Sequence, residues 1–287
     1  MKICGFTFVR NGVLYDYPFL ESIRSLLPLC DELIVAVGKS EDNTLEQIES
    51  IRSPKIRIIK TIWDDGLRES GSILSQQTNI ALDQVSGDWA FYLQADEVLH
   101  EKDYPAIKDA MFEFQNRNEI EAILFNYRHF YGSYDYIGDS RRWYRREIRI
   151  IRPSKKVCSW GDAQGFRIEG RKLQVKLINA SIYHYGWVKP PEIQQLKQKY
   201  FNKLWHSDDW VENNVGEAAV YDYSKGGKLK LFDGTHPAVM NDRVKNQYWQ
   251  FRYEQEKVSQ PFKERLLDSI EKKLGWRIGE YKNYKII

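Results

Sequence analysis

The strongest constraint on the fold lies in the first hundred residues, where short apolar segments alternate with segments of helical periodicity. The apolar segments predict strands at 3–9, 33–37, 56–62 and 89–93. Apolar residues at helical spacing predict helices between them, over about 18–27, 44–51 and 72–85. A continuous run as short as 33–37 is typical of a strand buried on both faces of a parallel sheet. The alternation therefore predicts an α/β fold whose first half consists of βαβ units.

The rest of the chain differs in character on the two sides of Pro190-Pro191. Before these prolines, β-like segments are predicted at 122–127, 147–151, 173–176 and 180–184. After them the sequence is aromatic and charged, and helices are predicted over 192–204, 242–257 and 261–274. We therefore expect a mixed sheet flanked by helices in residues 1–189 and a mainly helical C-terminal extension in residues 190–287.

The composition excludes several classes of protein. The 287 residues include 43 Lys plus Arg and 40 Asp plus Glu, a net charge of +3, so the chain lacks the dominant basic character of a dedicated nucleic-acid binder. No apolar run approaches the roughly 18 residues that span a bilayer. Cys4, Cys30 and Cys158 are an odd number without CxxC spacing, which favours free thiols. These features predict a cytoplasmic protein, and peripheral contact with the inner face of the membrane stays open.

Polar residues that follow the predicted strands are the first candidates for a site. Arg10 and Asn11 follow the first strand, Asp42 lies after the second, and Gln94 and Asp96 follow the fourth. Ligands of open α/β sheets bind outside the carboxyl ends of the strands. We therefore expect these residues to surround one crevice.

Asp96 and Glu97, directly after the fourth strand, suit a hard divalent cation. Mg²⁺ and Mn²⁺ take carboxylate oxygens, and one or two protein carboxylates suffice when a substrate phosphate supplies further oxygens. The alternative is an acidic helix start, in which both carboxylates only interact with the positive end of the helix dipole. Spacing alone leaves both interpretations open.

Three ordered motifs resemble those of the family 2 glycosyltransferases, which have the GT-A fold. They are Thr7-Phe8-Val9-Arg10-Asn11, the loop 38–44, and Gly87-Asp88-Trp89 leading into Gln94-Ala95-Asp96-Glu97. The resemblance covers the first two-thirds of the chain. It implies a Rossmann-like GT-A sheet that binds a nucleotide-diphosphate sugar, with a UDP-sugar as the first expectation. Residues 1–100 would then lie on the donor side and residues 101–189 on the acceptor side.

By this resemblance, Gln94-Ala95-Asp96 occupies the place of the family's acidic metal-binding motif. Asp96 would hold Mn²⁺ or Mg²⁺ against the diphosphate. Gln94 replaces the first acid of the motif, and its amide could hydrogen-bond the ribose or the donor sugar. His184 stands where similar enzymes have a histidine that completes the metal site, and imidazole suits Mn²⁺ better than Mg²⁺. A hydrogen-bonded structural histidine is the alternative.

The resemblance also implies a set of donor-binding residues. They are Thr7, Arg10, Asn11, Asp42, Gln77 and Asn79. Asp42 could instead cap the following helix, and Gln77 and Asn79 could be polar residues of a helix surface. The loop 38–44 lacks the paired acids with which relatives contact the base, so this loop does not define the nucleotide.

Inverting sugar transfer needs a general base that removes the proton of the attacking acceptor hydroxyl. Asp162, in a tryptophan-bearing segment that resembles the family's acceptor region, is the first candidate, and Glu169 is the reserve. A turn residue before Gly165 is the alternative role for Asp162. The basic-aromatic run 141–146 could bind an anionic acceptor or lie along an edge strand.

These features together predict a metal-dependent, inverting glycosyltransferase of the hexosyltransferase type, acting on a saccharide or lipid-linked acceptor in polysaccharide biosynthesis. Two alternatives stay open. The amide at Gln94 gives weight to an inactive module that binds a sugar nucleotide or a glycan. A nucleotidyltransferase would use a related fold, but the chain has no N-terminal glycine-rich phosphate loop. Trp160, Trp187 and Trp205 are candidates for stacking on sugar rings, with core packing as the alternative.

Overall fold

The first half of the chain forms the parallel part of a large sheet. The computed structural model describes residues 1–64, 66–67, 71–215, 218–254, 262–275 and 277–287. The parallel strands are β1 (Ile3–Val9), β2 (Glu32–Gly38), β3 (Ile56–Thr61) and β4 (Trp89–Tyr92). β1 lies between β2 and β4, and β3 pairs with the outer side of β2. These strands confirm the predicted ones to within one residue at each end.

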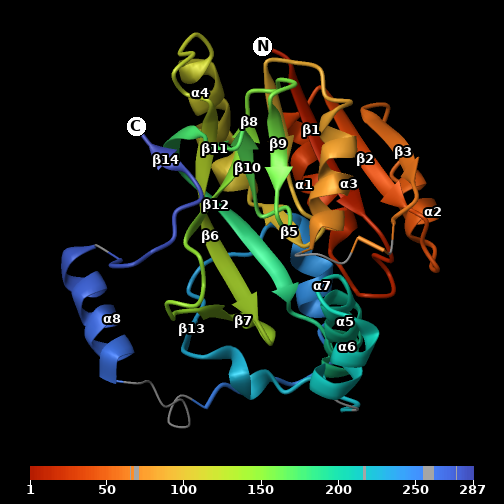
Figure 1. The fold of residues 1–287 in the computed structure, drawn as a ribbon, viewed down its shortest axis with the longest axis vertical. Coiled ribbons are helices and arrows are strands. Elements are labelled where there is room, and N and C mark those ends of the chain that lie inside the picture. The colour runs from red at the N-terminus through yellow and green to blue at the C-terminus, as the bar shows by residue number, and fades with distance from the viewer. Residues whose placement is uncertain (65, 68–70, 216–217, 255–261, 276) are drawn as a thin grey trace.

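Helices cover both faces of this sheet (Figure 1). The helices of the first half are α1 (Phe19–Leu26), α2 (Thr44–Glu49), α3 (Ser72–Leu82) and α4 (Tyr104–Phe114). α1 and α4 pack against the apolar residues at alternate positions of β2, such as Leu33 and Val35. α3 packs on the opposite face, where Ile34 and Ala36 point. A strand with apolar residues on both faces therefore separates two cores, as the run 33–37 predicts.

The second half extends the sheet with mostly antiparallel strands. These strands are β5 (Glu97–Leu99), β6 (Ala122–Tyr131), β7 (Ser133–Gly138), β8 (Arg146–Ile151) and β12 (Gln174–Trp187). β8 joins β4 to β6, and β12 runs parallel to β6. A small separate sheet contains β9 (Val157–Trp160), β10 (Gly165–Ile168) and β11 (Arg171–Lys172). The whole is the mixed α/β sheet flanked by helices that the sequence predicts.

Two predictions differ from the structure in their boundaries. The segments predicted at 173–176 and 180–184 belong to the single strand β12, whose pairing with β6 shifts register between Leu177 and Ser181. The helix predicted over 242–257 is wrong in length, because α7 covers only Asn241–Lys245. After α7 the aromatic side chains pack on the sheet instead: the Trp249 indole N–H donates to the carbonyl of Gly132. Residues 255–257 of that prediction lie outside the described residues.

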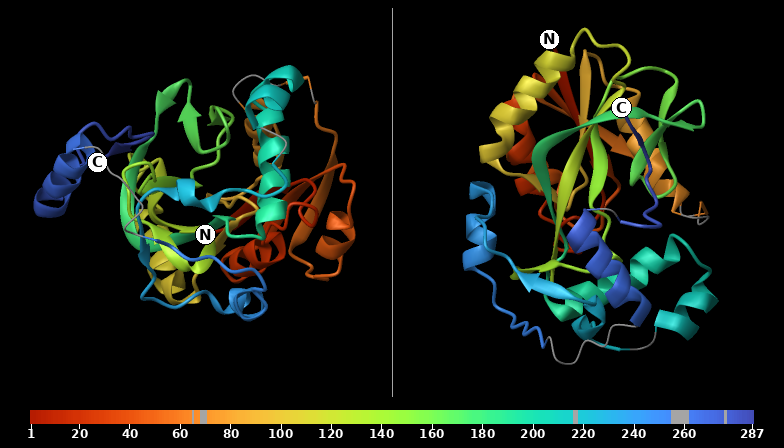
Figure 2. Two further views of the ribbon diagram at one scale, coloured as in Figure 1. Left: turned by 90° about the horizontal axis from the view of Figure 1, so that it is seen from below. Right: turned by 90° about the vertical axis from the view of Figure 1, so that its left-hand side faces the viewer.

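The segment after residue 189 is built into the rest of the fold. Its helices are α5 (Pro191–Lys203), α6 (Asp208–Val215), α7 and α8 (Phe262–Leu274). Its short strands β13 (Leu229–Leu231) and β14 (Lys285–Ile286) pair with β7 and β12. Figure 2 shows α8 at the periphery of the molecule. A division of the chain at 189/190 stays a prediction.

The basic run 141–146 fastens this C-terminal segment to the sheet. Arg141 and Arg145 both form ion pairs with Glu271 of α8, and Arg145 also pairs with Glu280. The guanidinium of Arg141 donates to the carbonyl of Ile278 as well.

Within the described part of the chain, no helix is both long enough and apolar enough to cross a membrane.

Candidate active site

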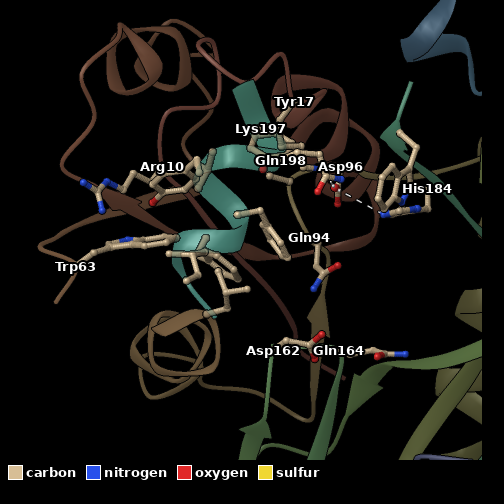
Figure 3. A pocket seen from close by; sticks show the side chains of 18 of the residues that line it. Arg10, Tyr17, Trp63, Gln94, Asp96, Asp162, Gln164, His184, Lys197 and Gln198 are labelled. Carbon is tan, nitrogen blue, oxygen red and sulfur yellow. Dashed lines mark hydrogen bonds and ion pairs between the residues drawn. The ribbon is translucent and has the colours of Figure 1, made fainter. Parts of the chain in front are cut away.

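A cavity of about 360 Å³ lies at the carboxyl ends of β1 and β4, where α5 crosses the edge of the sheet (Figure 3). Its walls come from the ends of β1, β3 and β4, the β9–β10 turn, β12 and α5. The cavity brings together five of the residues predicted from the sequence, namely Arg10, Gln94, Asp96, Asp162 and His184. The expected crevice at the strand ends is therefore present.

Asp96 and His184 face each other in this cavity. The Nε2 atom of His184 lies 3.6 Å from Oδ2 of Asp96, and Nζ of Lys197 lies 3.5 Å from the same oxygen. A Cβ atom at Gly186 would lie only 2.5 Å from Asp96 Oδ2 and 2.7 Å from His184 Nε2, so glycine leaves room for the pair. Burial opposes ionisation of Asp96, but His184, Lys197 and Lys189 outweigh it and hold the pKa of Asp96 below its ordinary value.

A second histidine sets the orientation of His184. β6 and β12 pair so that His129 stands directly beside His184, and their Nδ1 atoms are 3.1 Å apart. The Nε2 atom of His129 is 2.8 Å from the carbonyl oxygen of Tyr144, which can only accept, so this nitrogen carries the proton. Burial and the charge of His184 hold the pKa of His129 well below its ordinary value, so the ring is neutral. Nδ1 of His129 is therefore an acceptor for the Nδ1–H of His184, and Nε2 of His184 is left facing Asp96.

Glu97 does not line the cavity with Asp96, although the two are adjacent in the sequence. Its carboxylate is fully buried and forms a two-pronged ion pair with Arg149 of β8, at 2.7 and 2.8 Å. The same carboxylate accepts the backbone N–H of Gln94 and the hydroxyl of Tyr127. Glu97 is therefore not the second carboxylate ligand for a cation that the sequence suggests. It is buried, and its hydrogen bonds hold the loop that carries Asp96 in place.

Gln94 and Asp162 also line the cavity, and Gln94 lies between Asp96 and Asp162 (Figure 3). The Gln94 amide donates to the carbonyl of Ala163, at 3.3 Å, and so joins the end of β4 to the β9–β10 turn. Asp162 accepts the backbone N–H of Gln164, and burial raises the pKa of Asp162 above its ordinary value. Glu169, the reserve candidate, is exposed in the turn after β10, where it pairs with Lys156, and it does not line the cavity.

The end of the cavity near β1 and β3 is aromatic and cationic. The guanidinium of Arg10 lies 5.4 Å from the ring centre of Trp63 and donates to the carbonyl of Lys39. The Trp63 indole packs against Gly38, where a Cβ atom would lie 2.4 Å from Nε1. Val37-Gly38-Lys39 therefore contributes a flat surface for the Trp63 ring rather than acidic side chains.

The other predicted donor-binding residues on the β1 side shape the loops around the cavity rather than line it. Asp42 accepts the backbone N–H groups of Leu14 and Thr44, and it lies one residue before Asn43, the N-cap of α2. Asn11 has a positive φ of 53° and accepts the backbone N–H of Glu41. Thr7 is buried within β1.

The two predicted residues of α3 are also away from the cavity lining. Gln77 is fully buried, and its Oε1 atom has no partner among the described residues. Asn79 accepts the backbone N–H of Ser159 and thereby fixes β9 against α3. Neither residue is the surface polar group that the sequence alternative assumes. Of the tryptophans singled out, Trp187 lines the cavity, Trp160 is 53% exposed, and Trp205 packs with Leu204 and Gly71.

Sequence reasoning missed the contribution of α5. Lys197, Gln198, Tyr200 and Phe201 all line the cavity, and Tyr17 lies beside Lys197 (Figure 3). These residues belong to a helix that sequence reasoning assigned to an extension outside the catalytic half. The helical spacing of Lys197, Tyr200 and Phe201 is visible in the sequence, but the packing of that face on the sheet is not.

The residues present fit a single divalent cation that takes most of its ligands from elsewhere. Asp96 offers a carboxylate oxygen and His184 an imidazole nitrogen, both over the space left by Gly186. The described residues contain no group of three or more His, Cys, Asp or Glu side chains that could hold a metal unaided. Two protein ligands are enough for Mg²⁺ or Mn²⁺ when a substrate phosphate and water complete the coordination.

A sheet whose strand ends surround a cavity with an ionised carboxylate, an imidazole and a second, half-buried carboxyl group is typical of an α/β enzyme that binds its ligand at that edge. The chain matches the family model of glycosyl transferase family 2 over residues 17–174, more than half of its length. The protein belongs to this family.

Solved structures with a similar fold include S. aureus TarS. The structure of TarS 1-349 in complex with UDP is 20% identical over 46% of this chain and 37% of that chain, with a TM-score of 0.36. A further structure of S. aureus TarS is 16% identical over 70% of this chain and 39% of that chain, with a TM-score of 0.41. The chain thus spans less than half the length of these TarS chains, and a likeness at this level bears on neither substrate nor mechanism. A search of curated proteins gave no match.

Proposed function

We propose that the cavity binds a nucleotide-diphosphate sugar and that the enzyme transfers the sugar, with inversion, to a hydroxyl group of a saccharide, free or lipid-linked. The observation that carries the proposal is the Asp96–His184 pair, which puts an ionised carboxylate and an imidazole face to face at the strand ends. The family supplies the reaction class, and a cavity of about 360 Å³ is in the size range of small-molecule sites.

Asp162 is the general base in this proposal. Burial raises the pKa of its carboxyl group, which strengthens it as a proton acceptor. The acceptor oxygen forms a bond to the anomeric carbon as its proton passes to the Asp162 carboxylate. The bond from the anomeric carbon to the diphosphate breaks in the same step, and the nucleoside diphosphate leaves. One displacement of this kind inverts the configuration at the anomeric carbon.

The leaving diphosphate is assigned to the Asp96 end of the cavity. When bound by Asp96 and His184, a divalent cation would neutralise the negative charge of the diphosphate. The imidazole ligand favours Mn²⁺ over Mg²⁺. Gln94, held against the Ala163 carbonyl, has an amide oxygen with which to accept a hydroxyl of the sugar or ribose.

The nucleoside is assigned to the opposite end of the cavity, where Trp63 and Arg10 offer a flat aromatic surface and a cation. A UDP-sugar is the first donor to test. The compartment that we propose is the cytoplasm, at most peripheral to the inner face of the membrane, because all three cysteines are free thiols. Polysaccharide biosynthesis is the process that we propose for such a reaction.

Turnover tests the proposal. The purified protein is incubated with UDP-, GDP- and dTDP-sugars and Mn²⁺, and release of nucleoside diphosphate is measured with and without EDTA. We expect release from one class of donor, loss of release in EDTA, and a fall of about 100-fold or more for Asp96→Ala. No release from any donor would contradict the proposed function, and full activity of the folded Asp96→Ala variant would remove Asp96 from the site.

A further inference from the structure

Lys197 brings a cation into the cavity from outside the part of the chain that matches the family. It lies on α5, and residues 17–174 are the matched range. Its ammonium group is 3.5 Å from Asp96 Oδ2 and donates to the carbonyl of Gly186 at 2.9 Å. The side chain is 11% exposed and lines the cavity. Figure 3 shows Lys197 beside Asp96 and Tyr17.

A second lysine, Lys189, is buried close to Lys197. Lys189 is fully buried, and both ammonium groups approach the ring of Tyr17, at 4.9 Å for Lys189 and 4.8 Å for Lys197. Lys189 donates to the carbonyl of Asp16, and no carboxylate of the described residues lies within ion-pair distance of it. The Asp96 carboxylate interacts with Lys197 and Lys189, and it also faces His184. Burial lowers the pKa of Lys189 to about 7, and an anion in the cavity favours the charged forms of both lysines.

The position of Lys197 suits a diphosphate, which has two negatively charged phosphates, better than a single neutral hydrogen-bond acceptor. Lysine carries three donors on a flexible stem, and among the described residues Lys197 has two polar partners, Asp96 and the Gly186 carbonyl. An anion that enters the cavity beside Asp96 meets the repulsion of that carboxylate. The Lys197 ammonium group offsets this repulsion from the other side of the same space.

We propose that Lys197 is a diphosphate-binding residue, which holds the leaving group of the donor from α5 while Asp96 and His184 hold it from the sheet. This inference rests on the proposed function, because it assigns a residue to the same donor site. It makes α5 part of the donor-binding machinery.

The test uses inorganic pyrophosphate, which carries the diphosphate without base or sugar, and UDP, GDP and dTDP. Binding is measured by calorimetry in Mn²⁺ and in EDTA for the wild type, Lys197→Met, Lys197→Gln, Lys197→Arg and Lys199→Met. Lys199 is the matched control, because it lies on the same helix and lines a different cavity. Circular dichroism checks that each variant is folded. If Lys197→Met is not folded, Lys197→Gln is used in its place.

We expect the neutral variants to bind pyrophosphate about tenfold to hundredfold more weakly, because a charge-assisted hydrogen bond is lost. Lys197→Arg should keep most of the affinity, and Lys199→Met should match the wild type. Wild-type affinity in a folded neutral variant would overturn the role of Lys197 and leave the proposed function standing. A wild-type protein that binds neither pyrophosphate nor any of the three nucleoside diphosphates would overturn the proposed function itself, and the role of Lys197 with it.

Discussion

At the scale of single residues, His129 determines which nitrogen of His184 faces Asp96. His129 accepts at Nδ1 because its Nε2–H is committed to the Tyr144 carbonyl. Partners of this kind fix the tautomer and ring orientation of a ligating histidine. The chemistry proposed for Asp96 and His184 therefore depends on a residue that touches neither the donor nor the acceptor.

Replacing His129 by Phe should weaken metal use without removing the aromatic packing around it. The ring would still stack on Trp143, but His184 would lose the acceptor for its Nδ1–H. We expect activity to fall about 10- to 100-fold and the Mn²⁺ concentration for half-maximal activity to rise. A Mn²⁺ titration of activity checks this, with His206→Phe, which stacks on Trp210 away from the cavity, as control. An unchanged Mn²⁺ dependence would mean that His129 does not position His184.

Glu147 is a buried acid whose protonation couples folding to pH. Burial raises its pKa from 4.5 to about 7, against the effects of Arg149 and a hydrogen bond from Gln164. Its second carboxylate oxygen has no hydrogen-bond partner among the described residues. The folded protein keeps the proton that the unfolded chain loses above pH 4.5, so Glu147 makes stability fall as pH rises from about 4.5 to 7.

Glu147→Gln should remove this loss of stability. A neutral amide of the same size can still accept from Gln164, and burying it costs no charge. We expect the free energy of unfolding at pH 8 to increase by up to about 3 kcal/mol over the wild type, with little difference at pH 4.5. Urea unfolding at several pH values measures this. Parallel pH profiles for the two proteins would show that Glu147 does not titrate in this range.

At the scale of elements, two positions along α5 have different tasks. Leu204, directly after the helix, packs with Trp63, Ile73 and Leu74, while Lys197 approaches Asp96 about two turns earlier. The apolar contact therefore sets the position from which Lys197 reaches the cavity.

Shortening Leu204 should loosen this contact. Leu204 is 6% exposed, and we expect Leu204→Ala to lower the free energy of unfolding by about 2–4 kcal/mol. The donor KM should rise as well, because the helix that carries Lys197 is less firmly held. Leu196→Ala, at a position on the same helix that is 40% exposed, is the control and should change both quantities little. A donor KM unchanged by a strongly destabilising Leu204→Ala would separate the packing of α5 from donor binding.

At the scale of the whole molecule, local sequence patterns predict the strands and their ends, whereas long-range packing determines which side chains meet in the cavity and around it. The run 33–37 and the segment 89–93 are apolar enough to be recognised as strands without context, so the place of Asp96 at a strand end followed. The inward turn of Glu97 depends on Arg149, which is 52 residues away. The contact between Lys197 and Asp96 depends on how a C-terminal helix packs. Neither contact leaves a periodic signal in the sequence.

Local hydrogen bonds explain why some of the candidate residues lie outside the cavity. Asp42 and Asn79 have short polar side chains, which serve loop geometry as readily as ligand binding. The side-chain oxygens of Asp42 and Asn79 accept hydrogen bonds from the backbone N–H groups of Thr44 and Ser159, respectively. Motif position alone could not separate these two roles.

A crystal structure with Mn²⁺ and the nucleoside diphosphate that the donor assay identifies tests the central claim most directly. The account predicts the diphosphate in the cavity, with Mn²⁺ located by its anomalous scattering between Asp96 and His184. It also predicts the Lys197 ammonium group on a phosphate oxygen and the base against Trp63. A nucleotide bound elsewhere, with Asp96, His184 and Lys197 still paired only with one another, would contradict the account.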